Sequence, residues 1–191
     1  MSRQLQLIRV LEAYAPTPEE VSFRDQMLAL ASGPDDPFSR NQFVPGHFTA
    51  SGFVMSPDGG ALLLVHHRRL ERWLQPGGHI DPEDRDPVVA AAREVREETA
   101  VTLAEPLPMD IFDIDVHAIP AARGEPTHVH FDLRFLFCAE TDEFEADDEV
   151  LAAAWVPIDE IAAGWEDASV QRVAARMAAT AGTPRYRRNP S

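Results

Sequence analysis

One short segment carries three glutamates at a spacing that could hold a divalent cation. Asp86-Pro87 is a favourable helix start, because Asp caps the first turn and Pro fits the first helical position. At about 100° per residue, Glu94, Glu97 and Glu98 fall on one face of that helix. Their mutual repulsion is relieved by a divalent cation, and an all-oxygen ligand set selects Mg²⁺ or Mn²⁺ over zinc. The alternative interpretation is a solvated acidic helix face.

The elements around this helix favour the metal interpretation. A second stripe of the helix is apolar and is expected to be buried: Val88, Ala92, Val95 and Thr99. Gly77-Gly78 breaks the chain before the helix and lets the backbone approach a ligand closely, so that a carbonyl oxygen could join the carboxylates. Arg93 precedes Glu97 by four residues and could orient its carboxylate.

The segment from Gly78 to Val101 resembles the Nudix box, G-x5-E-x7-R-E-U-x-E-E-x-G-U, in which U is a bulky aliphatic residue. The matching residues are Gly78, Val101 and the run Arg93-Glu94-Val95-Arg96-Glu97-Glu98. Asp84 stands where the family has its first Glu, with one extra residue before Arg93, and it can still accept hydrogen bonds from an arginine. Ala100 replaces a glycine that would allow a positive φ at the helix end, a strain that costs about 1 kcal/mol.

The resemblance implies a hydrolase that cleaves a diphosphate linkage in a nucleoside diphosphate derivative, with water attacking phosphorus. It implies Mg²⁺ or Mn²⁺ held by Glu94, Glu97, Glu98 and the Gly78 carbonyl oxygen. Arg93 would hold a carboxylate in place. The general base would be Glu94 or an acid from the loop that contains Glu143, Glu145 and Glu149; plain solvated charge is the alternative for the loop acids.

Strands and helices are mixed along the chain, which predicts an α/β or α+β class. Strands are expected over 48–55, 61–65, 111–119 and 127–138, and helices over 86–99 and 166–180. The resemblance implies the Nudix fold, a mixed β-sheet sandwiched between helices, over residues 47–182. Residues 1–46 form an N-terminal helical extension and linker, with a helix started by Thr17-Pro18-Glu19-Glu20. Residues 183–191 form a basic tail.

The strand over 127–138 has an aromatic face and a polar face. His128, His130 and Asp132 share the polar face and are candidates to bind substrate in a cleft of this fold. The alternative is a half-exposed strand with ordinary polar residues. His128-x-His130 could also be a pair of transition-metal ligands, although no third soft ligand is obvious.

Basic and histidine side chains precede the glycine turn. Of Arg68, Arg69 and Arg72, one could reach a substrate phosphate, with Arg68 the candidate; the alternative is a solvated basic turn. The nearby imidazoles are expected to be structural or to face solvent: His66, His67 and His79.

Charge and cysteine content restrict the partners. The 191 residues include 32 acidic and 17 basic ones, so the net charge of −15 repels nucleic acid polymers. A small phosphorylated nucleotide can still bind when a cation lies between the negative charges. A single cysteine excludes a disulfide framework and fits a reducing cytoplasm. No apolar run has membrane-spanning length, so no membrane partner is expected.

The sequence leaves the substrate open. ADP-ribose, dinucleoside polyphosphates, sugar nucleotides and oxidised nucleoside triphosphates all fit the motif. A Nudix-fold module that senses a nucleotide without catalysis is the alternative, and the complete set of three glutamates argues against it. The apolar stripe between Val21 and Ala31 suits a cover over the cleft or a homodimer contact.

Overall fold

A computed structural model describes residues 2–68, 70–105, 107–122, 124–148 and 150–180. Its helices are α1 (Arg3–Ala13), α2 (Val21–Ala31), α3 (Pro87–Thr99), α4 (Ile158–Ala163) and α5 (Ala168–Thr180). Its strands are β1 (Gly46–Met55), β2 (Ala61–His67), β3 (Arg72–Leu74), β4 (Gly77–His79), β5 (Asp113–Ile119), β6 (His128–Cys138) and β7 (Val150–Pro157). The predicted elements of the central region are present, and the predicted basic tail lies outside the described residues.

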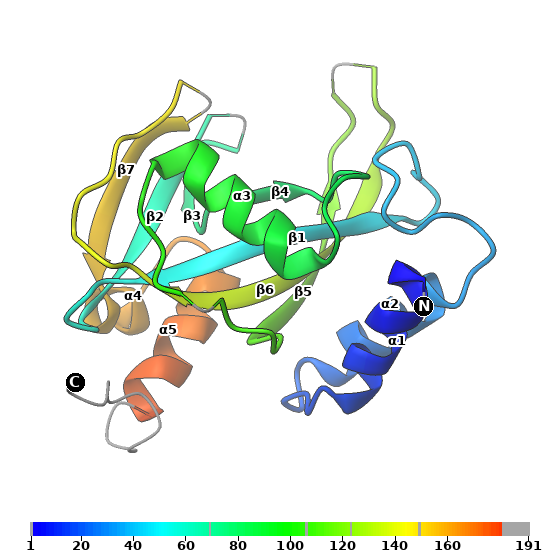
Figure 1. Ribbon diagram of the computed structural model, residues 1–191, viewed down its shortest axis with the longest axis horizontal. Coiled ribbons are helices and arrows are strands. Elements are labelled where there is room, and N and C mark those ends of the chain that lie inside the picture. The colour runs from blue at the N-terminus through cyan, green and yellow to red at the C-terminus, as the bar shows by residue number, and fades with distance from the viewer. Residues whose placement is uncertain (1, 69, 106, 123, 149, 181–191) are drawn as a thin grey trace.

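The strands form one mixed sheet with the order β3-β2-β1-β6-β5, while β4 pairs with β1 and β7 pairs with β2. β1 and β6 run parallel along their whole length, from Gly46 opposite Val129 to Met55 opposite Cys138. The other pairings are antiparallel. Figure 1 shows α3 lying across one face of this sheet, with α4 and α5 away from it on the other side.

The alternation along β1 creates a core on each face of the sheet. Phe48, Ala50 and Val54 pack in the cluster that includes α3, whereas Phe53 packs in the cluster under α4 and α5. Gly52 lies where α3 comes closest, because a Cβ there would lie 2.7 Å from the Val95 side chain. The close packing of α3 on β1 fixes the height of the helix above the sheet.

The N-terminal extension contains two helices that pack against the α3-side core through Leu7, Leu11 and Met27. The Thr17–Glu20 segment is a turn before α2, not its first turn, so the predicted Thr17 hydroxyl cap is wrong. The Glu20 carboxylate still accepts a hydrogen bond from the Thr17 backbone N–H at 2.7 Å, which is the reciprocal half of a capping box.

The polar faces of β5 and β6 are buried at their aspartates and at Arg134, whereas His117 and His130 are half-buried. Asp113, Asp132 and Arg134 are each less than 5% exposed. Arg134 forms ion pairs with both aspartates, and Arg172 of α5 reaches Asp113 at 3.0 Å. Alternation predicts two different faces but not that a helix will supply opposite charges to cover the polar one.

Within the described part of the chain, none of the helices combines the length and the apolar character that crossing a membrane requires.

Candidate active site

The two ends of α3 form as their residue types predict. The Asp86 side chain accepts a hydrogen bond from the Val89 N–H, and Pro87 occupies the first turn. At the other end, Ala100 takes a left-handed conformation with φ of 50°, and its N–H donates to the Arg96 carbonyl oxygen. The chain therefore adopts the expected turn after Thr99 although it has no glycine there.

Arg93 is the centre of a polar network at the start of the site. Its Nη2 and Nε donate to the two carboxylate oxygens of Asp84 at 2.9 and 3.3 Å. Its Nη1 donates to Glu94 and to Glu97, each at 2.9 Å. The hydrogen bonds with Asp84 are the main reason why the pKa of Arg93 lies above its usual range. The guanidinium thus holds two of the motif glutamates against one buried aspartate.

Asp84 accepts from Arg93 as the sequence predicts. It is 5% exposed, and its Oδ2 also accepts from the Asp81 N–H at 2.9 Å. The extra residue before Arg93 is accommodated in the turn that precedes α3, where Asp86 starts the helix.

The Gly77-Gly78 segment lies directly against the acidic face of α3. A Cβ on Gly78 would lie 2.6 Å from the Glu94 carboxyl carbon, so only glycine fits there without moving that carboxylate. The Gly77 N–H donates to Glu98 Oε2 at 3.2 Å. The Gly77-Gly78 backbone therefore lies against the carboxylates of Glu94 and Glu98.

The three glutamates differ in burial. Glu98 is 8% exposed, whereas the side chain of Glu97 is 59% exposed. Burial raises the pKa of Glu94, and the neighbouring Arg93 opposes that shift. Among the described residues, only one group of three potential metal ligands has all its ligand atoms within 4.8 Å of one another, and it is not the three glutamates. Their carboxylate oxygens are therefore spread more widely than that.

The acidic loop after β6 runs along the end of α3. The Glu145 N–H donates to the Thr99 carbonyl oxygen at 2.8 Å, and the Asp147 N–H donates to that of Glu98 at 3.0 Å. Glu143 and Glu145 are exposed on this loop, and Glu149 lies outside the described residues. The loop acids are therefore carried next to the helix turn that bears the motif glutamates.

A family model for the NUDIX domain matches residues 46–177, which is more than half of the chain. The chain belongs to the Nudix family. The predicted Nudix fold is confirmed by the mixed sheet between helices and by solved structures. A NUDIX-family hydrolase from Clostridium perfringens superposes with a TM-score of 0.54 and 19% identity, over 70% of this chain and 97% of that one.

A second solved Nudix-type structure has a similar fold. The dihydroneopterin triphosphate pyrophosphohydrolase of E. coli has a TM-score of 0.52 and 18% identity, over 68% of this chain and 92% of that one. Among curated proteins, none matches this chain. These likenesses establish the Nudix fold alone.

The candidate substrate residues of β6 lie on the face of the Nudix sheet opposite α3. Asp132 is 4% exposed and accepts hydrogen bonds from Thr49, Ser51 and Arg134. His128 is also buried, and its Nε2 lies 3.2 Å from Nε2 of His130.

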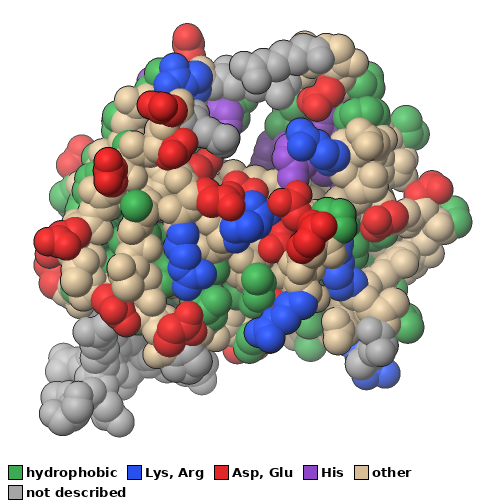
Figure 2. Space-filling model, turned by 45° about the horizontal axis from the view of Figure 1, so that its top comes forward, with side chains coloured by type: hydrophobic (Ala, Val, Ile, Leu, Met, Phe, Trp, Pro, Cys, Tyr) green, Lys and Arg blue, Asp and Glu red, His purple; other side chains and the backbone are tan. Residues whose placement is uncertain are grey.

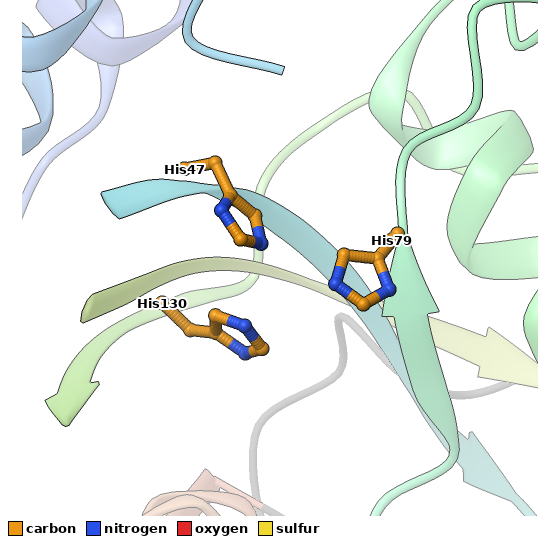
Figure 3. Close-up of side chains that lie close together, drawn as sticks. All are labelled: His47, His79 and His130. Carbon is orange, nitrogen blue, oxygen red and sulfur yellow. The ribbon is translucent and has the colours of Figure 1, made fainter. Parts of the chain in front are cut away.

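Two further histidines join this face, and sequence reasoning missed one of them. His47, His79 and His130 each offer a ring nitrogen, and these nitrogens lie within 4.8 Å of one another. Figure 3 shows the three rings gathered between β1, β4 and β6. The alternation of His47, Thr49 and Ser51 along β1 is the signal that could have placed His47 on the polar face.

His47 is buried and His79 and His130 are half-buried, so the charged forms of all three rings are disfavoured. Burial, reinforced by the charge of His47, lowers the pKa of His79 to about 4 and that of His130 to about 2. Burial also lowers the pKa of His47. Figure 2 shows histidine side chains beside a hollow, next to a band of mixed acidic and basic side chains. His79 is therefore neither isolated nor simply facing solvent.

The basic turn before the Gly77-Gly78 segment contacts the acidic loop that follows β6. Arg68 Nη2 donates to the carbonyl oxygens of Asp148 at 2.8 Å and Val150 at 3.3 Å, which ties the end of β2 to the acidic loop. Arg72 is exposed and lies 3.9 Å from Asp167. Arg69 lies outside the described residues.

Proposed function

We propose that this Nudix protein hydrolyses a diphosphate linkage in a nucleoside diphosphate derivative, with Mg²⁺ or Mn²⁺ as cofactor. The observation that carries the proposal is the packing of Gly78 on Glu94 beside the Arg93–Asp84 network. In a family defined by this segment, that arrangement supports a catalytic site better than a solvated helix face, because an exposed acidic face needs no arginine paired with a buried aspartate.

The donor set fits a hard divalent cation. Glu94, Glu97, Glu98 and the Gly78 carbonyl oxygen would hold the ion, and all four donors are oxygens. When bound, such an ion neutralises phosphate oxygens and lowers the pKa of a coordinated water. The same charge balance explains how a chain with a net charge of −15 can accept a polyphosphate.

The protein's own residues supply positioning and a base. Arg93 orients the carboxylates of Glu94 and Glu97, and the Gly77 N–H orients that of Glu98. Glu94 is the first candidate for the general base, because its burial favours the proton-accepting role at neutral pH. An acid of the loop, Glu143 or Glu145, is the second.

Substrate contacts are proposed for Arg68 and for the histidines of β6. Arg68, His128 and His130 remain candidates to bind the phosphate or nucleoside portions of the substrate. Asp132 already accepts from several protein donors, so we propose that it positions Thr49 and Ser51 on β1. The small phosphorylated substrate, rather than a nucleic acid polymer, is the proposed partner.

The test is a panel assay of the full chain with Mg²⁺ or Mn²⁺. The panel holds ADP-ribose, dinucleoside polyphosphates, sugar nucleotides and oxidised nucleoside triphosphates, and phosphate-containing products are measured by chromatography. Glu97→Gln is expected to lower kcat by at least about 100-fold, as loss of a group that stabilises transition-state charge does. Glu160→Gln, on the exposed surface of α4, is the matched control and should keep full activity.

The alternative function predicts a different result from the same panel. A nucleotide-sensing module would bind one compound tightly in calorimetry and convert none, with or without the cation. Turnover that survives Glu97→Gln unchanged would remove this helix from the mechanism.

A further inference from the structure

The histidine cluster on the face opposite α3 has the composition of a second metal site. We propose that His47, His79 and His130 together bind a transition-metal cation of the Zn²⁺ type. Imidazole nitrogens suit Zn²⁺ and its neighbours in the first transition row, whereas Mg²⁺ prefers oxygen. This site is therefore chemically distinct from the glutamate site and takes a different ion.

The sheet register explains why three separated segments meet here. On β1, His47 lies opposite His130 of the parallel strand β6. His79 of β4 lies opposite Thr49, two residues further along the same face of β1. Because side chains alternate along strands, the three rings project from one face, as Figure 3 shows. The scaffold is regular sheet, which holds ligands more precisely than a loop does.

The hydrogen bonding of His47 leaves one nitrogen for a ligand. His47 is 1% exposed, and its Nδ1 lies 3.0 Å from the Gln42 carbonyl oxygen. A carbonyl oxygen can only accept a hydrogen bond, so Nδ1 of His47 carries the proton and its Nε2 carries the lone pair. That Nε2 is buried and has no hydrogen-bond partner. A buried polar atom without a partner is unfavourable, and coordination of a cation would offset that cost.

His130 is oriented by a neighbour in the same manner. His128 Nδ1 lies 2.8 Å from the Pro126 carbonyl oxygen, so His128 donates there and its Nε2 accepts. His130 Nε2 lies 3.2 Å from His128 Nε2 and is the donor of that hydrogen bond. The lone pair of His130 is therefore on its Nδ1. A ligand imidazole fixed through its other nitrogen is the usual outer arrangement of protein metal sites. His128 is thus a positioning residue.

The geometry requires little rearrangement. A tetrahedral zinc ion has Zn–N distances of about 2.0–2.1 Å, which places the nitrogens roughly 3.4 Å apart. The ring nitrogens already lie within 4.8 Å of one another, so modest ring rotations complete the site. Three protein ligands leave a fourth position for water or an anion.

The proposed ion would connect the two sites of the protein through β4. Gly78 faces Glu94 on the α3 side, and His79 projects from the opposite side. The His79 carbonyl oxygen also accepts from Arg93 Nη2 at 3.0 Å. A metal bound to His79 would therefore fix the position of β4, which contains Gly78 and accepts the hydrogen bond from Arg93.

The test measures metal binding rather than catalysis. The full chain, stripped with a chelator, is titrated with ZnCl₂ by calorimetry, with Mg²⁺ in large excess to occupy the carboxylate site. We expect a single equivalent of Zn²⁺ to bind and to raise the Tm, because an ion that binds only the folded state stabilises it. Co²⁺ in place of Zn²⁺ should give the intense visible bands of a tetrahedral site.

Single substitutions assign the ligands. His79→Gln and His130→Gln should each weaken Zn²⁺ binding by at least about 100-fold and remove the Co²⁺ bands. His66→Gln, outside the cluster, and Glu97→Gln, in the carboxylate site, should bind Zn²⁺ as the wild type does. If His47→Gln fails to fold, His79→Gln still tests the proposal, because His79 is only half-buried.

Two results would overturn the proposal. One is the lack of Zn²⁺ binding by the wild type in excess Mg²⁺. The other is equal Zn²⁺ affinity in the wild type and in folded His79→Gln. Neither result bears on hydrolysis, so the proposed function stands or falls separately.

Discussion

Arg93 and Asp84 form a two-point ion pair, with Nη2 and Nε of the arginine 2.9 and 3.3 Å from the two carboxylate oxygens of the aspartate. Asp84 stands where the Nudix pattern has glutamate, and it reaches the guanidinium although its side chain is one methylene shorter. The turn before α3 makes up the difference, because it brings the Asp84 backbone close enough for its carboxylate to be buried beside Arg93.

Asp84→Ala should destabilise the protein and disorganise the site. The substitution leaves Arg93 partly buried without its main partner, which costs about 1–3 kcal/mol at a position that is not fully desolvated. Urea unfolding measures this loss. The turnover of whichever panel substrate is active should fall by at least about tenfold, because Glu94 and Glu97 lose the fixed position of the guanidinium.

Asp81→Asn is the matched control for this change. Asp81 also lies near Arg93, at 3.4 Å, but its side chain is 52% exposed. Exposed pairs contribute about 0–1 kcal/mol, so the unfolding midpoint should hardly move. Equal destabilisation by the two substitutions would contradict the dominant role of Asp84.

Gly78→Ala should impair the site through contact rather than through backbone strain. A Cβ at this position would lie 2.6 Å from the carboxyl carbon of Glu94 and would push that side chain aside. We expect kcat to fall by about tenfold or more, as displacement of a positioned group does. Gly164→Ala is the control, because a Cβ on Gly164 meets nothing within 4 Å; a normal rate in Gly78→Ala would show that Glu94 need not be held there.

Ala100→Gly should stabilise the protein. Ala100 has a φ of 50°, in the left-handed region that favours glycine by about 1 kcal/mol. The free energy of unfolding should rise by a similar amount, minus a few tenths for the added freedom of glycine in the unfolded chain. Ala175→Gly, in the interior of α5, should have the opposite sign, with a loss of about 1 kcal/mol. A loss at both positions would mean that Ala100 is not strained.

The sequence was sufficient for the elements whose signals are local. The Asp86-Pro87 start, the Arg93-Glu94-x-x-Glu97-Glu98 face and the alternation of β6 each depend on neighbours within a few residues, and each element formed where expected. Asp84 could also be matched to Arg93 because the motif fixes their separation to within one residue.

The histidine cluster could not be predicted, because its members are distant along the chain. His47, His79 and His130 meet only through the parallel pairing of β1 with β6 and the pairing of β4 with β1. His128-x-His130 was visible as a ligand pair, but its partners depend on register. The buried charges under α5 were missed for the same reason, since Arg172 reaches Asp113 from 59 residues away.

Asp113 is surrounded by three arginines and by the carboxylate of Glu20. Arg134 and Arg172 donate to its Oδ1, and Arg176 lies 3.5 Å from its Oδ2. Burial raises the pKa of Asp113 to about 6, against which the arginines act. Burial also disfavours the charge of Glu20, but hydrogen bonds from Thr17 and Tyr14 lower its pKa to about 2. Glu20 therefore keeps its charge next to Asp113, which is the last of the group to ionise.

Asp113→Asn should remove one component of the pH dependence of stability. Between pH 4 and 6 the unfolded chain has lost the Asp113 proton while the folded chain retains it, so unfolding releases a proton. The contribution of Asp113 to the free energy of unfolding therefore falls as pH rises through this window, by at most about 1.4 kcal/mol per pH unit. Asparagine stays neutral, so Asp113→Asn should gain stability relative to the wild type from pH 4 to 6. Urea midpoints across that range measure the difference, with Asp159→Asn on the exposed surface of α4 as the control. A difference that stays constant with pH would show that Asp113 is ionised in the folded protein throughout.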